Sequence, residues 1–358
     1  MVLYWRLWQL QFSLPTKKYV LRCMILVTGG TGLVGSHLLV ALTKAGHRVR
    51  AIHRSESSFD AVKKVFSYDP QGHKLYQQIE WHEANLLDIP RLNDAFKDIT
   101  VVYHCAAYIS FDPKKDALLR KTNITGTANI VNLSLSHKVN KLCYVSSIAT
   151  LGQADDQGKI DEENDWNPEE NHNVYSIAKY GAELEVWRAS QEGLKTVIVN
   201  PGVILGEGHW ESASGIIFSL AHKGIPFITK GNIAVIDVLD VVDAMVALTA
   251  SQISNQRFTL VGHNCSYKHF LELLCGALDR KPPSPYIAKF WLLSLSKLDR
   301  LSNLLFRTKR KLFKETVKSM YSKDHYDSSS IQSTIDFTFR PLEESINRIC
   351  NCFLNDRS

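Results

Sequence analysis

Residues 24–54, MILVTGGTGLVGSHLLVALTKAGHRVRAIHR, form a segment in which the hydrophobic pattern changes twice. A short apolar run at 25–27 ends in a glycine cluster. The apolar side chains between Leu33 and Leu42 then recur with the period of a helix. Gly46 stands just past the expected end of that helix, and Val49-Arg50-Ala51-Ile52 is typical of a second strand. The segment therefore predicts a strand, a helix and a second strand in direct succession.

The glycines between the first strand and the helix, TGGTGLVG at 28–35, have spacing with a physical meaning. The first permits a tight turn, the second lets the backbone approach a pyrophosphate, and the third lets the helix pack closely on the sheet. The helix N-terminus offers N–H groups and a partial positive charge to phosphates. A glycine-rich connector without a ligand is the alternative, but the flanking strand and helix favour a dinucleotide site. The predicted contacts are Thr28, Gly29, Thr31, Gly32, Leu33 and Val34.

The end of the second strand indicates which nucleotide is bound. A carboxylate there would bind the ribose 2′-hydroxyl of NAD, but the chain continues Ile52-His53-Arg54. The forked guanidinium of Arg54 suits a 2′-phosphate. We therefore expect NADP(H), with NAD(H) as the open alternative and with Arg54 as an exposed loop cation as the competing interpretation.

Strand-like and helical patterns continue to alternate as far as residue 200. Strands are expected at 79–84, 100–104, 141–146 and 196–199, and long helices at 116–137 and 174–192. This alternation predicts an α/β fold with a doubly wound parallel Rossmann sheet.

Glycine and proline interrupt the pattern after residue 200, and helical stretches return near 239–252, 267–279 and 286–306. We expect 24–200 to form an NAD(P)-binding domain. Residues 201–358 should form mainly a smaller, mostly helical substrate lobe, with some segments returning to the Rossmann core. Such a lobe would cover the carboxyl ends of the strands, where open α/β sheets bind ligands.

Tyr175 and Lys179 are four residues apart within the second long helix, so they share one helix face. A tyrosine normally has a pKa of ~10, and a neighbouring ammonium lowers it. Lys179 is also placed to hold the nicotinamide ribose. Ser146 and Ser147 close the fifth strand, and one hydroxyl there could donate to a substrate oxygen. We favour Ser147; the alternative is that both serines only cap the strand.

These motifs together resemble the extended short-chain dehydrogenase/reductase superfamily, of the NAD-dependent epimerase/dehydratase type. The similarity is greatest to the branch of dihydroflavonol reductases and 3-beta-hydroxysteroid dehydrogenases. It extends from Met24 to about residue 345. Its carriers are TGGTGLVG at 28–35, HCAA at 104–107, NITGT at 123–127, YVSSI at 144–148, YSIAK at 175–179 and NPGVILG at 200–206.

The resemblance implies roles for individual residues. Ser147 would be catalytic together with Tyr175 and Lys179, and Asn123 would support a proton relay through the lysine. The further cofactor contacts it implies are Asn85, Leu86, Cys105, Ala106, Ala107, Tyr175, Lys179, Pro201 and Val203. Asn85 departs from the family pattern, since an aspartate that contacts adenine is common at this position.

Three functions are compatible with these residues. The favoured one is an NAD(P)(H)-dependent oxidoreductase that transfers hydride between nicotinamide and a ketone, aldehyde or secondary alcohol. The second is a nucleotide-sugar epimerase or dehydratase. Against it, the segment IAVIDVLD at 233–240 lacks the phosphate-binding arginine typical of sugar epimerases, although Asn200-Pro201 weakly favours them. The third is a non-catalytic NADP-sensing protein, which would not need Ser147, Tyr175 and Lys179.

Composition sets the remaining expectations. The 358 residues are 45% hydrophobic and 22% charged, with a formal charge of +6. A basic run, RTKRK at 307–311, fits a solvated helix face better than a nucleic-acid or anionic-lipid site, because no aromatic stacking platform accompanies it.

The seven cysteines form no CxxC pair, so we expect a reduced, cytoplasmic protein without a metal site. The expected partner is a small carbonyl or alcohol substrate and no nucleic acid; a homodimer is left open.

The first 23 residues precede the expected first strand. Residues 1–14 are apolar and aromatic but too short to span a bilayer. We expect residues 1–23 to be a flexible leader, with a peripheral membrane anchor as the alternative.

Overall fold

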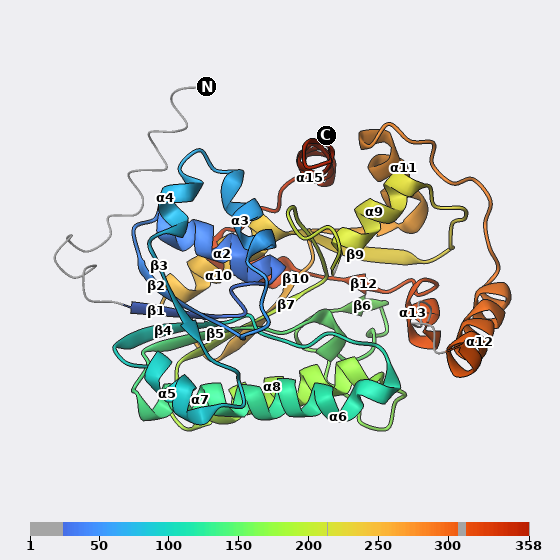
Figure 1. Cartoon of the computed structure of the whole chain (residues 1–358). Helices are drawn as coiled ribbons and strands as arrows, with labels where there is room; N and C mark the ends of the chain where they lie inside the picture. Colours follow the sequence, from blue (N-terminus) through green and yellow to red (C-terminus); the bar gives the residue numbers. More distant parts are fainter. Residues whose placement is uncertain (1–23, 213, 307–312, 358) are drawn as a thin grey trace.

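The centre of the molecule is a parallel sheet of seven strands (Figure 1). The computed structural model describes residues 24–212, 214–306 and 313–357, so the predicted leader at 1–23 lies outside the described residues. The strand order is β10-β7-β5-β4-β1-β2-β3. The bounds are β1 (Met24–Thr28), β2 (Arg48–His53), β3 (Ile79–Glu83), β4 (Ile99–His104), β5 (Lys141–Val145), β7 (Thr196–Pro201) and β10 (Gln256–Leu260).

The order of the strands reverses at β1, which pairs with β2 on one side and with β4 on the other, both in parallel. Crossover helices on the two sides of such a reversal leave a crevice at the carboxyl ends of the strands. This confirms the predicted doubly wound sheet. The seventh strand, β10, was not expected from the sequence; it is supplied by the C-terminal half and pairs with β7.

Helices cover both faces of the sheet, which explains why its central strands are almost uniformly apolar. One face carries α2 (Leu33–Lys44), α3 (Asp60–Ser67), α4 (Gly72–Tyr76), α10 (Val238–Ala250) and α14 (Ser329–Ile335). The other carries α5 (Ile89–Ala95), α7 (Gly126–Ser136) and α8 (Val174–Gln191).

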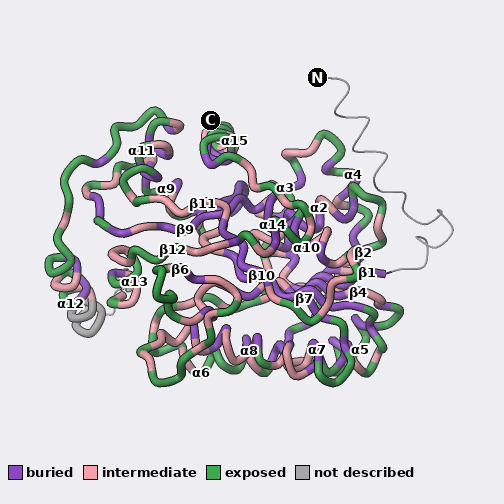
Figure 2. The backbone as a smooth tube through the Cα atoms, turned by 180° about the vertical axis from the view of Figure 1, so that it is seen from behind, coloured by how far each residue is buried: buried purple, intermediate pink, exposed green. Residues whose placement is uncertain are grey.

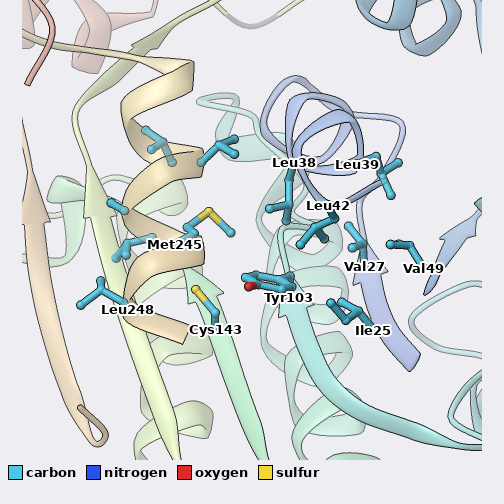
Figure 3. Packing of buried hydrophobic residues seen from close by; sticks show 14 of the residues in the cluster. Ile25, Val27, Leu38, Leu39, Leu42, Val49, Tyr103, Cys143, Met245 and Leu248 are labelled. Atoms are coloured by element: carbon cyan, nitrogen blue, oxygen red, sulfur yellow. The ribbon is translucent and has the colours of Figure 1, made fainter. Parts of the chain in front are cut away.

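Two hydrophobic clusters join these helices to the sheet. In the first, Leu38 and Leu42 of α2 and Met245 of α10 pack over Val27 and Tyr103 of the sheet (Figure 3). Figure 2 shows the buried residues concentrated along the strands and the exposed ones along the outer segments. Each fully buried side chain of this size contributes about 1.5–3 kcal/mol to folding, so the sheet and its helices form a rigid support for the crevice.

The long helix predicted at 116–137 is not continuous. It consists of α6 (Asp116–Leu119), a π-helical turn over Arg120–Thr125 and α7. A π turn contains one more residue than an α turn, so it leaves the apolar pattern on both sides helical. The sequence pattern therefore could not distinguish the interrupted helix from a regular one.

The C-terminal lobe contains a small mixed sheet as well as helices. Its strands are β8 (Val203–Leu205), β9 (Asn232–Asp237) and β11 (His263–Ser266). They pack with α9 (Gly215–Lys223), α11 (Tyr267–Ala277) and α15 (Leu342–Asn355) around a third hydrophobic cluster. The lobe therefore has its own core, which anchors it beside the crevice.

The remaining elements are short or peripheral. The helices are η2 (Pro113–Lys115), η4 (Ile148–Thr150), α12 (Lys289–Phe306) and α13 (Lys314–Ser319), and the strands are β6 (Lys159–Ile160) and β12 (His325–Tyr326). Within the described ranges, no helix is both long enough and apolar enough to cross a membrane.

Candidate active site

The turn between β1 and α2 presents bare backbone. Gly29 has φ +69°, and a Cβ there would lie 2.7 Å from the backbone of Ala106. Gly32 is the N-cap of α2 and provides no side-chain cap. A Cβ on Gly35 would lie 2.1 Å from the carbonyl oxygen of Gly29, so the helix packs directly on the turn. This cradle fits a pyrophosphate held by main-chain N–H groups at a helix N-terminus.

The side chains predicted to border this turn are close to it. Thr31, Leu33 and Val34 are half-buried. The side chain of Leu33 lies beside Gly206, where a Cβ would come within 2.9 Å of it. The turn is therefore bordered by the segment that follows β8 as well as by its own residues.

Thr28, the last residue of β1, is buried, and its side chain bonds within the protein. Its Oγ1 bonds to His104 Nδ1 at 2.6 Å and accepts from the Ala106 N–H at 3.2 Å. The Cys105 N–H donates to its carbonyl oxygen at 3.2 Å. Thr28 thus fixes the segment after β4 beside the glycine turn rather than presenting its hydroxyl to a ligand.

The segment after β4 becomes progressively exposed: Cys105 and Ala106 are half-buried and Ala107 is exposed. Burial raises the pKa of the Cys105 thiol. This thiol therefore stays protonated at neutral pH and is not an activated nucleophile. The three residues form a smooth apolar wall between the glycine turn and α8.

The residues predicted for the adenosine side lie beyond β2 and β3. Arg54 is exposed; its main-chain N–H donates to Ser57 Oγ at 3.1 Å. No hydrogen bond or ion pair from the described part of the chain holds its guanidinium. Asn85 is exposed and its Oδ1 accepts from the Leu87 N–H at 3.1 Å. Leu86 is buried against α7. Arg54 is thus available to a charged ligand, whereas the Asn85 side chain already shapes its own loop.

Asn123 lies in the π turn and binds a neighbouring loop. Its Oδ1 accepts from the Tyr108 N–H at 2.7 Å, and its Nδ2 donates to the Tyr108 carbonyl at 2.9 Å. The side chain is only 2% exposed. These bonds go to main chain fifteen residues away, so Asn123 holds the segment that follows Ala107.

Pro201 and Val203 end β7 and begin β8. A Cβ on Gly202 between them would lie 2.6 Å from the Ala234 carbonyl oxygen. Pro201 is buried and Val203 is half-buried. They lie where the chain leaves the main sheet for the lobe, so a ligand in the crevice would meet them at its edge.

Tyr175 and Ser147 come together although they belong to different elements. Tyr175 lies in the first turn of α8, whose N-cap Asn173 accepts from the Ser176 N–H at 2.9 Å. Ser147 lies two residues after the end of β5 and caps a short 3₁₀ turn. Burial raises the pKa of Tyr175, and a hydrogen bond with the Ser147 side chain opposes that rise. The phenol is therefore a protonated donor at neutral pH.

Lys179 is 2% exposed and lies one helical turn beyond Tyr175. Its Nζ donates to Tyr144 Oη and to the Val145 carbonyl oxygen, both at 2.7 Å. Burial lowers its pKa to about 7, while the charge of Glu183 acts to raise it. Lys179 thus lies between its two protonation states near neutral pH. The sequence predicted that its charge would lower the pKa of Tyr175; in the structure, burial prevails and raises that pKa.

A chain of buried polar groups continues from Lys179 to the glycine turn. Thr127 hydrogen-bonds to the Tyr144 side chain, and Thr127 Oγ1 lies 2.9 Å from His104 Nε2. His104 Nδ1 in turn meets Thr28. Burial, followed by the charge of Lys179, lowers the pKa of His104 to about 3, so its ring is neutral. These groups connect Lys179 with the end of β1.

Glu183, one turn beyond Lys179, is fully buried at the centre of a second network. Its Oε2 accepts from Ser146 Oγ at 2.5 Å, Thr150 Oγ1 at 2.8 Å and Asn200 Nδ2 at 3.0 Å. On the other side, Arg257 Nη1 approaches its Oε1 at 3.3 Å. The Ser146 hydroxyl is therefore occupied by its hydrogen bond to Glu183, and Ser147 is the serine beside Tyr175.

Sequence reasoning did not assign roles to His104, Thr127, Tyr144 or Glu183. Each is a polar residue in an otherwise apolar strand or on the inner face of a helix, and Glu183 repeats the four-residue spacing of Tyr175 and Lys179. That spacing was the available signal. Within the described residues, no three His, Cys, Asp or Glu side chains are arranged to hold a metal ion.

Comparison with known proteins agrees with this geometry. The sequence profile of the NAD dependent epimerase/dehydratase family matches residues 25–260, well over half of the chain. The chain belongs to this family. An NAD(P) nucleotide is accordingly its expected cofactor, and the resemblance to extended short-chain dehydrogenases/reductases is confirmed.

Its relatives include both reductases and epimerases. A putative dihydroflavonol 4-reductase from Synechocystis sp. is 30% identical over 219 residues, which are 60% of each chain. A UDP-glucose 4-epimerase from Vibrio cholerae is 28% identical over 72% of this chain and 76% of that protein. Cinnamoyl-CoA reductase 1 from Petunia hybrida is 25% identical over 84% and 93%. Family membership therefore leaves open which reaction this chain performs.

Solved structures show the same fold. The crystal structure of gox2253 aligns with a TM-score of 0.76 at 23% identity, covering 93% of this chain and 98% of that one. A UDP-glucose 4-epimerase from Thermotoga maritima aligns with a TM-score of 0.71 at 20% identity, covering 94% and 100%.

Proposed function

We propose that this family member is an NADP(H)-preferring oxidoreductase that interconverts a carbonyl group and an alcohol on an apolar substrate. The observation that carries the proposal is the convergence of Ser147, Tyr175 and Lys179 beside a glycine turn fit for a dinucleotide. A non-catalytic nucleotide sensor would have no need for a buried lysine with a pKa near 7 one helical turn from a half-buried tyrosine.

In this proposal the bound nucleotide supplies or accepts hydride, and the protein handles the proton. Tyr175 donates its proton to the substrate oxygen during reduction and recovers it during oxidation. Ser147 gives that oxygen a second hydrogen bond. Negative charge develops on the oxygen in the transition state, so donors directed at it act selectively on that state. Lys179 holds the nicotinamide ribose, and Asn123 keeps the neighbouring loop in position.

The C-terminal lobe contains an apolar cavity to which we assign the hydrocarbon part of the substrate, although none of its lining residues is among the predicted site residues. It has a volume of about 300 Å³ and is formed by α9, α11 and the loop at 224–229. The residues that give it this character include Ile217, Leu220, Ile225, Phe227, Phe270 and Leu271. Such walls favour hydrocarbon or aromatic groups and make the desolvation of a diphosphate costly.

The arginines near β9 and the start of α10 also support this proposal. This is the region in which a sugar epimerase would carry its phosphate-binding arginine. Two arginines reach β9 and the start of α10, and both are paired with carboxylates. Arg348 Nη2 binds both oxygens of Asp237 at 2.7 Å, and Arg340 pairs with Asp240 and Asp243. Both guanidinium groups are thus already neutralised by protein carboxylates.

The preference for NADP(H) rests on Arg54. Its exposed guanidinium, free of ion pairs within the described chain, is the group we assign to the 2′-phosphate. NADPH should bind more tightly than NADH, and Arg54→Ala should narrow the difference. Fluorescence titration of both nucleotides checks this, and tighter NADH binding by the parent protein would overturn the assignment.

Nucleotide-sugar epimerisation is the second candidate, supported by the relatives from Vibrio cholerae and Thermotoga maritima. The two functions differ in redox balance, because epimerisation consumes no nucleotide. We would follow NADPH oxidation with a panel of aryl and alkyl ketones and aldehydes, and analyse UDP-glucose for UDP-galactose in parallel. Net oxidation with an apolar carbonyl is expected; epimerisation without it would replace our proposal.

A further inference from the structure

Helix α12 lies at the edge of the molecule (Figures 1 and 2), and it carries an exposed apolar face. Phe290 and Trp291 are 69% and 62% exposed, and Leu295 and Leu298 are 46% and 60% exposed. With 100° per residue, these four side chains fall within an arc of about 140°. They therefore form one continuous stripe, which we call the α12 face.

The buried side of α12 fixes the outward orientation of the α12 face. Leu292 is 1% exposed and Ser296 is 4% exposed, and both lie on the side away from the α12 face. The segment just before α12 is tied to the lobe, because the Ile287 N–H donates to the Ile228 carbonyl oxygen at 3.0 Å. The Tyr321 hydroxyl donates to the Ile287 carbonyl oxygen at 2.7 Å. The apolar stripe is thus turned outward by the packing of the helix.

Positive charge is concentrated in the part of the sequence that contains this helix. Residues 280–323 of the sequence contain 12 of the 42 Lys and Arg residues but only 2 of the 36 Asp and Glu residues. The rest of the chain therefore has a formal charge of −4, although the whole chain has +6. Among the described side chains, Lys289 and Lys297 on α12 and Lys314 and Lys318 on α13 are exposed.

We propose that the α12 face docks on an anionic lipid surface, with the helix lying in the plane of the interface. An apolar stripe containing Trp and Phe, with Lys297 at its edge, has the chemistry of an interfacial helix. Anionic headgroups complement the local positive charge. A symmetric contact between two α12 faces would bring two basic regions together, and their repulsion disfavours it.

The experiment is sedimentation of the full chain with phosphatidylcholine vesicles, with and without phosphatidylserine. We expect binding only when phosphatidylserine is present, and weaker binding as salt rises. Trp291→Gln with Leu298→Gln should reduce the partition coefficient by roughly tenfold or more. Lys297→Gln should reduce it by roughly fivefold.

The matched control is Ile89→Gln with Leu184→Gln, a pair of leucine-sized side chains on other helices with 53% and 47% exposure. It should bind vesicles as the parent does, and all variants should keep the parental melting temperature. No binding to phosphatidylserine vesicles would overturn the proposal. So would parental binding by the α12 variants, which would assign the membrane contact to another segment. A change from dimer to monomer in the α12 variants without vesicle binding would instead assign the face to a second copy.

Discussion

At the scale of single residues, the site depends on how burial changes proton affinity. Lys179 and Tyr175 experience opposite shifts from the same cause: burial lowers the pKa of the lysine and raises that of the tyrosine. Both shifts favour the neutral forms. Glu183 opposes the lysine shift, so a fully buried carboxylate without a catalytic contact helps to set the charge of the site.

The Glu183→Gln variant tests this influence. The carbonyl oxygen of Gln can still accept hydrogen bonds, but the negative charge that raises the pKa of Lys179 is gone. That pKa should therefore fall below about 7. If the ammonium is required, the alkaline decline of kcat/KM should begin at lower pH in the variant. A profile that coincides with that of the parent would show that Glu183 is only structural.

At the scale of elements, the π turn at Arg120–Thr125 determines the position of Asn123. It places Asn123 where one amide satisfies both main-chain groups of Tyr108. The loop after β4 is therefore held by a side chain from the opposite wall of the crevice.

Asn123→Ala should leave both main-chain groups of Tyr108 without their partner. We expect a stability loss of about 2 kcal/mol, since an orphaned buried group costs about 1–3 kcal/mol. Asn132→Ala is the matched control: Asn132 is an exposed residue of α7, so the change should stay within about 0.5 kcal/mol. Urea unfolding measures both, and equal losses would refute the role of Asn123 as a clamp.

At the scale of the whole molecule, an ion-pair cluster joins the lobe to the main sheet. Arg348 of α15 pairs with Glu207 and Asp237, and Glu207 Oε1 also lies 3.6 Å from His37 Nε2 of α2. Burial acts to raise the pKa of Glu207, but the nearby His37 and the charge of Arg348 hold it at about 2.

This cluster predicts an acid-dependent stability. The folded pKa of Glu207 lies below its usual value of ~4.3, so its contribution is complete above that value and is lost as pH falls towards 2. The contribution is about 3 kcal/mol at neutral pH. Glu207→Gln should be less stable than the parent at pH 7, and the difference should shrink below pH ~4. Urea unfolding across this range measures it; a difference independent of pH would exclude Glu207 as the titrating group.

The sequence predicted what depends on local pattern. The glycine turn, six of the seven strands and the pair Tyr175 and Lys179 follow from spacing within one element. The strand β10 and the π turn did not, because a short edge strand and an inserted residue leave little trace in periodicity. The buried partners of Lys179 were also missed, since the packing of α8 on β5 decides which side chains meet.

The central claim is that Tyr175 is the proton donor of an oxidoreductase, and Tyr175→Phe tests it most directly. The variant loses one hydroxyl and keeps the ring, so folding, NADPH binding and the contact with Phe111 should persist. Steady-state oxidation of NADPH, with the carbonyl most active in the panel, should fall roughly a hundredfold or more in kcat. Turnover at the parental rate, with intact nucleotide binding, would contradict the account.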